Sequence, residues 1–115
     1  MLFAAPQSRA EDLLAGWEKK DKVLLGTALG TLAVDWGQTR DIAKHPERFS
    51  ESNPILGTHP SVGKVDRYFI AAMAGTAGIA YVLPSPYRTW FLGGVTVMET
   101  AVIIDNHHLG LRMKF

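Results

Sequence analysis

The stretch YFIAAMAGTAGIAYVL, residues 68–83, decides which class of protein the sequence predicts. It carries no charge, and no polar face recurs along it at the 3.6-residue period typical of helices that border water. Half of its residues are Gly, Ala or Thr. Glycine costs a helix in water about 1 kcal/mol relative to alanine, whereas membrane helices use small residues to pack closely. The stretch therefore favours a membrane helix over the alternative, a buried helix of a soluble bundle.

Two further apolar blocks flank this stretch, VLLGTALGTLAV at 23–34 and TWFLGGVTVMETAVII at 89–104. A membrane core of roughly 30 Å requires about 20 helical residues, so each block reaches that length only with its flanking residues. We expect transmembrane helices over 21–43, 66–84 and 87–108. The predicted fold is an all-α integral membrane protein in one domain, 1–115, that crosses the bacterial inner membrane several times and has the lipid bilayer as a partner.

The remaining segments are expected to be an N-terminal helix and a loop. Over residues 8–20, Ser8 and Glu11 have the spacing of a capping box, and the apolar residues share one helical face. This amphipathic helix is expected either to lie on the membrane surface or to pack on the rest of the protein. Residues 44–65 contain three prolines and are expected to form a structured loop.

The composition excludes several functional classes. The net charge of +1 offers no basic stripe for a nucleic-acid partner. The chain has no cysteine, so disulfides, thiolate metal sites and cysteine nucleophiles are excluded. No cofactor is expected.

Two carboxylates, Asp35 and Glu99, fall inside the predicted spans. A carboxylate at membrane depth costs about 2.5–3.5 kcal/mol, so each is expected to face protein and to pair with a side chain of another segment. The candidate partners are Gln38, Arg40, Asn53, Arg88 and Asn106.

Three interpretations of these carboxylates stay open. They pin one packing arrangement of the helices, or they line a wet seam in a holin-like assembly that permeabilises the membrane. In the third interpretation they serve a metal-dependent, membrane-embedded hydrolase in which Asp35, Glu99 and His107 are the weak metal candidates, with Glu51 and His59 added from the loop. No HExxH motif or other fixed ligand spacing supports that third interpretation, and no catalytic residue is assigned.

Small residues at four-residue spacing predict helix–helix association. Gly26 and Gly30 form a GxxxG pair, and the second block repeats this spacing. We expect a non-enzymatic protein that associates through its helices with itself, as a homo-oligomer, or with a larger membrane complex. The predicted helix-packing residues are Gly26, Gly30, Ala71, Gly75 and Gly78.

The segments DWGQTR (35–40) and ESNPILGTHPSVGKV (51–65), followed by Tyr68-Phe69, resemble small membrane proteins encoded by bacteria and their phages. Leu83-Pro84 continues the resemblance, which covers roughly residues 35–110. It implies a loop folded over the helix ends but no particular activity. Together with Gln38, the matching polar residues would then form one buried network: Asp35, Arg40, Glu51, Asn53, His59, Arg88, Glu99 and Asn106.

Overall fold

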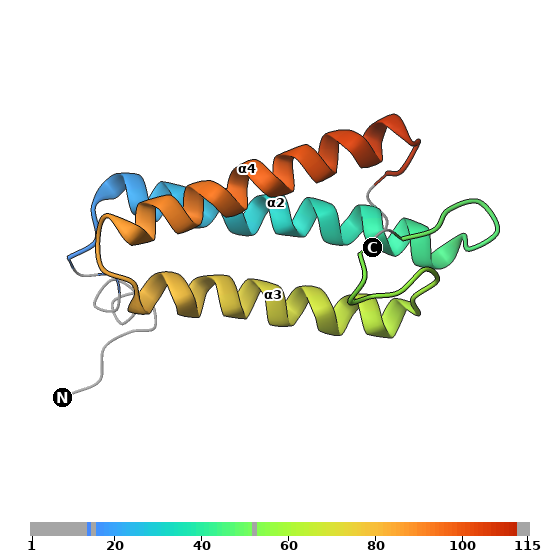
Figure 1. Cartoon of the computed structure of the whole chain (residues 1–115), viewed down its shortest axis with the longest axis horizontal. Helices are drawn as coiled ribbons and strands as arrows, with labels where there is room; N and C mark the ends of the chain where they lie inside the picture. The colour runs from blue at the N-terminus through green and yellow to red at the C-terminus, as the bar shows by residue number, and fades with distance from the viewer. Residues whose placement is uncertain (1–13, 15, 52, 113–115) are drawn as a thin grey trace, which may run out of the picture.

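The computed structural model describes residues 14, 16–51 and 53–112, and all regular secondary structure in these ranges is α-helical. The three helices are α2 (Lys19–Lys44), α3 (Val62–Val82) and α4 (Tyr87–His108). Helix α3 runs antiparallel to the other two, so α2 and α4 are parallel (Figure 1). The N-terminal helix predicted over residues 8–20 lies mostly outside the described residues; its last two residues belong to α2.

Local signals explain where the helices begin and end. Helix α3 begins four residues before the predicted span because Ser61 is its N-cap, with its hydroxyl accepting from the amide of Lys64 at 3.1 Å. Helix α2 ends immediately before His45-Pro46, where proline disfavours a helical conformation of the preceding residue. The turn from Pro84 to Pro86, with a cis peptide between Ser85 and Pro86, joins α3 to α4.

The prediction of transmembrane helices over 21–43, 66–84 and 87–108 is wrong, and so is the placement of the chain as a multi-pass inner-membrane protein. In the described part of the chain, no helix combines the length and the apolarity that a membrane crossing requires. Charged residues shorten each apolar run. In α3 the uncharged run begins only after Arg67 and covers about 22 Å, against a membrane core of about 30 Å.

Four buried residues of α2 are spaced seven positions apart, which places them along one side of the helix. Asp21, Ala28, Asp35 and Ile42 are all buried. Helix α2 contacts both α3 and α4 extensively, whereas α3 and α4 touch each other little. The apolar core consists of two clusters, one of Trp17, Ala28, Ala80 and Leu92, the other of Leu32, Leu56, Val65 and Phe69.

The loop between α2 and α3 contributes one anchor to this core. Leu56 is 2% exposed and packs with the cluster around Phe69. A turn at Asn53 aims it there, because the Asn53 side chain accepts from the amide of Ile55 at 2.8 Å. Gly57 has a φ of +85°, which a residue without Cβ adopts readily. The loop therefore folds back onto the helices and forms one wall of the pocket described below.

The five small residues expected to pack helices together do not do so within the chain. The structure places Gly26 and Gly30 on an exposed strip of α2, and Ala71, Gly75 and Gly78 on an exposed face of α3. A Cβ added at any of the four glycines would meet no atom within 4 Å. These faces are open to another molecule.

Candidate functional site

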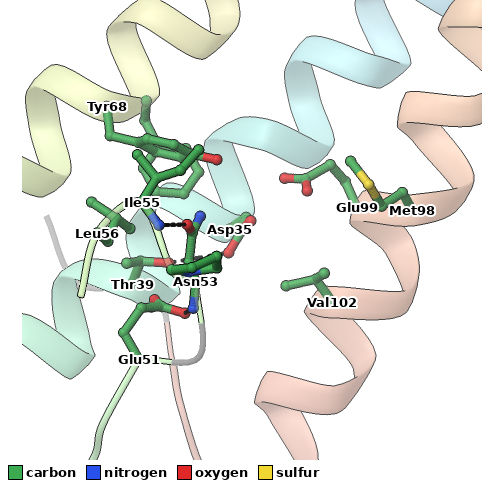
Figure 2. Close-up of a pocket in the computed structure, with 12 residues that line it drawn as sticks. Asp35, Thr39, Glu51, Asn53, Ile55, Leu56, Tyr68, Met98, Glu99 and Val102 are labelled. Carbon is green, nitrogen blue, oxygen red and sulfur yellow. Dashed lines mark hydrogen bonds between the residues drawn. The ribbon is translucent and has the colours of Figure 1, made fainter. Parts of the chain in front are cut away.

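A pocket of about 310 Å³ lies between the three helices and the loop, on the side where α3 and α4 diverge (Figure 2). Helix α2 forms its floor, and the loop closes one side. Its polar lining consists of Asp35, Thr39, Glu51, Asn53 and Glu99. Its apolar lining includes Leu56, Tyr68, Phe69, Met98 and Val102.

Asp35 and Glu99 meet in this pocket from two different helices. The Glu99 side chain points from α4 toward α2, where Asp35 lies (Figure 2). Each of the two carboxyl groups is near enough to shift the pKa of the other. Asp35 is 8% exposed and Glu99 is 6% exposed. The pair is therefore largely shielded from solvent. The residue that Glu99 faces, Asp35, was not among the partners expected for it from the sequence.

Burial is the main influence on the acidity of this pair. It raises the pKa of Glu99 to about 8, helped by the neighbouring Asp35 carboxyl group and its negative charge. Burial also raises the pKa of Asp35, although the neighbouring Glu99 carboxyl group and the hydrogen bond from Thr39 act in the opposite direction. Two interacting carboxyl groups resist being ionised together, and with the pKa of Glu99 at about 8 the pair retains a proton at neutral pH.

Amide side chains hold Asp35 in place and tie α2 to α4. The side-chain amide of Asn106 donates to Gln38 at 3.1 Å and to Asp35 at 3.5 Å. Gln38 in turn donates to the backbone carbonyl of Ile103 at 3.3 Å, and the Thr39 hydroxyl donates to Asp35 at 3.1 Å. Of the predicted network, the structure thus brings together Asp35, Gln38, Glu99 and Asn106.

Glu51 and Asn53 reach the pocket from the loop. The Glu51 carboxylate accepts from the backbone amide of Asn53 at 3.1 Å, and the Glu51 amide donates to the carbonyl of Thr58 at 2.8 Å. These bonds stiffen the loop where it borders the pocket.

The two arginines of the predicted network lie elsewhere. Arg40 forms a salt bridge with Asp66 of α3, and the indole of Trp36 donates to the same carboxylate at 2.8 Å. The Arg40 guanidinium, with the Trp36 indole, lowers the pKa of Asp66. This bridge joins α2 to α3.

Arg88 lies near the opposite end of α4 from Asn106. Its Nε donates to the carbonyl of Ala80 at 2.8 Å, and its guanidinium stacks 4.2 Å above the ring of Trp17. Asp21 lies beside it, fully buried, and accepts from the Thr89 hydroxyl at 2.6 Å. Arg88 therefore belongs to a separate polar cluster around Asp21.

The two histidines singled out from the sequence lie outside the pocket. His59 is exposed in the loop, and His107 is exposed near the end of α4. Within residues 14, 16–51 and 53–112, no group of three or more His, Asp or Glu side chains is arranged to hold a metal ion.

Sequence reasoning missed Asp21, Thr89 and Asp66. A signal for the first was present, because Asp21 precedes Asp35 by two heptads and so lies on the same side of α2. Leu92, Glu99 and Asn106 repeat the seven-residue spacing on α4. Aligning these two periodic rows would have paired Asp35 with Glu99 directly.

The comparisons with known proteins add no relative: no protein-family model matches this chain, and no curated protein or solved structure matches it. The functional interpretation therefore rests on the geometry above.

Proposed function

We propose that this protein is a small self-associating helical module that pairs with a second copy of the same chain through the exposed face of α3. The observation that carries the proposal is the apolar character of that face. Four large apolar residues project from it, Ile70, Ile79, Tyr81 and Val82, with exposures of 47–73%. Large apolar side chains exposed on one helix in this number are typical of a surface that packs against another protein.

The face is complementary to itself, which favours a second copy over an unrelated partner. Ala71, Gly75 and Gly78 leave a shallow strip between the larger side chains of Ile70 and Ile79. In a twofold pair, large residues of one copy fill the small-residue strip of the other, and the reverse contact follows by symmetry. Small residues also allow two helix axes to approach to the short end of the usual 8–10 Å separation.

Charge favours an antiparallel pair. The exposed cations of α3, Lys64 and Arg67, are confined to its N-terminal end. Parallel helices would bring these cations against their copies, and like charges in an interface are unfavourable. An antiparallel pair places them beside the uncharged C-terminal end of the other helix, near Tyr81 and Val82.

The exposed strip of α2 is a weaker candidate although it carries the GxxxG pair. Its exposed residues extend only from the lysine cluster at residues 19–22 to Gly30. The residues from 31 to 43 are buried or partly buried against α3 and α4. The strip is therefore short and begins with like charges, so we assign the contact to α3.

Sedimentation velocity of the full chain over about a hundredfold range of concentration tests the proposal, because mass action separates monomer from dimer. We expect a dimer that dissociates on dilution. Gly75→Leu places a large side chain in the strip, where an added Cβ meets no atom within 4 Å, and is expected to weaken dimerisation at least about tenfold, or about 1.4 kcal/mol.

Gly30→Leu is the matched control, since it makes the same change on α2, where the added Cβ also meets no atom within 4 Å. It should dimerise like the unchanged chain. Circular dichroism of both variants checks that their helices are retained. A monomer at every concentration, or equal weakening by the two substitutions, would contradict the proposal.

A further inference from the structure

One buried oxygen in the pocket has no partner. Among the described residues, Oε1 of Glu99 is inaccessible to solvent and receives no hydrogen bond. The side chain is 6% exposed and points into the pocket toward Asp35 (Figure 2). A buried carboxyl group that receives no hydrogen bond costs free energy, so the position favours a ligand that supplies an N–H donor to Glu99.

The rest of the pocket favours an organic ligand over a bare ion. Beyond Asp35, Glu51 and Glu99, its walls include Leu56, Phe69 and Val102. The rings of Tyr68 and Phe69 pack edge to face with their centroids 5.0 Å apart, which adds aromatic surface to one wall. Aromatic faces attract cations, and apolar walls bind a hydrocarbon substituent.

We infer that this pocket binds a singly charged organic cation whose N–H groups donate to Asp35 and Glu99 and whose apolar substituent lies against Phe69 and Val102. The volume of about 310 Å³ is at the lower end of the roughly 300–1,000 Å³ typical of small-molecule pockets, which limits the ligand to one ring or a short chain. This inference does not rest on self-association, because the pocket residues lie apart from the exposed face of α3.

Binding is coupled to release of a proton. Four titratable groups line the pocket, one from each surrounding element: Asp35 of α2, Glu51 of the loop, Tyr68 of α3 and Glu99 of α4. The proton shared by Asp35 and Glu99 is the one a cation displaces, since a positive charge beside both oxygens favours their ionised forms. With the pKa of Glu99 at about 8, affinity for a permanent cation rises about tenfold between pH 7 and pH 9.

Benzylguanidinium is the probe, because its guanidinium keeps its charge and its N–H donors across this pH range. Benzylurea is the matched neutral compound of nearly the same shape. Isothermal titration calorimetry with the full chain at pH 7 and pH 9 should show saturable binding of benzylguanidinium that tightens about tenfold, and binding of benzylurea at least about tenfold weaker. Titrations in two buffers of different ionisation enthalpy should show nearly one proton released per cation at pH 7.

Glu99→Gln keeps the size of the side chain and removes the titrating group. It should abolish the pH dependence and leave affinity near the pH 7 level of the unchanged chain. Glu47→Gln makes the same change at an exposed position of the loop and should bind as the unchanged chain does. Proton release is measured on the unchanged chain, so it remains decisive if Glu99→Gln folds poorly. Equal binding of benzylurea, absence of proton release, or equal effects of the two substitutions would overturn the inference.

Discussion

Glu99→Gln is expected to stabilise the protein at alkaline pH. In the unfolded chain the carboxyl of Glu99 ionises near its ordinary pKa of 4.5, whereas burial beside Asp35 raises the pKa in the folded chain to about 8. Between these two values the folded state holds a proton that the unfolded state has lost. The free energy of unfolding therefore falls as pH rises through this window, and glutamine, which does not titrate, removes the effect.

The magnitude follows from the width of the window. A span of about 3.5 pH units, at about 1.36 kcal/mol per unit, corresponds to roughly 5 kcal/mol when the window has been crossed completely. Because Glu99 shares its proton with Asp35, part of this energy belongs to the pair, and glutamine removes only the contribution of Glu99. We expect the variant to gain at least about 2 kcal/mol over the unchanged chain between pH 5 and pH 9.

Urea unfolding followed by circular dichroism at pH 5, 7 and 9 measures this difference. Comparing the two proteins at each pH and at one protein concentration cancels the titration of all other groups and any effect of self-association. Glu47→Gln is the control and should keep a constant difference from the unchanged chain. A stability difference between Glu99→Gln and the unchanged chain that does not vary with pH would refute the buried, proton-sharing description of Glu99.

Three further substitutions test the contacts that hold the helices together, each by urea unfolding. Asp66→Asn breaks the salt bridge to Arg40 and should lower the free energy of unfolding by about 1 kcal/mol at pH 7. Because that bridge lowers the pKa of Asp66, this loss should fade toward pH 3, and a loss that persists there would contradict an ionic origin. Leu92→Ala empties a fully buried position and should cost about 2–5 kcal/mol, whereas less than 1 kcal/mol would show that the position is not in the core. Thr89→Val removes the donor to fully buried Asp21 and should lower the free energy of unfolding by about 1–3 kcal/mol. An unchanged stability would show that this hydrogen bond does not stabilise the fold.

The positions of the helices follow closely from the apolar blocks. Two of the blocks lie within α2 and α4, and the third ends one residue beyond α3. Proline and a serine cap set several of the boundaries, and both are local signals. The sequence does not show in the same way what covers those blocks. An apolar block without a polar face looks alike in sequence whether lipid, a neighbouring helix or another protein covers it, and only the length of the uncharged run separates these cases.

The site was harder to derive because its members are far apart in sequence. Asp35 and Glu99 stand out individually as carboxyls in apolar surroundings, and Asn106 lies close to Glu99 on the same helix. Pairing them requires the register between α2 and α4, which the sequence encodes only as two seven-residue rows. Arg40 shows the consequence, because one turn beyond Trp36 it faces α3 and Asp66, away from the pocket.

Register also explains why acidic residues occur in the core at all. Helices α2 and α4 are parallel, so sliding one along the other by a turn would cost little free energy if only methyl groups met between them. Asp21 with Thr89 at one end, and Asp35 with Glu99 and Asn106 toward the other, match only in a single alignment. Buried polar groups are a known means of fixing helix register. Thr89 donates to one oxygen of Asp21, and the Arg88 guanidinium lies 4.0 Å from the other. Register alone could be fixed as well by the amides of Gln38 and Asn106. The unpartnered oxygen of Glu99 adds nothing to that alignment and costs stability at neutral pH and above, which is the reason to assign it to a ligand.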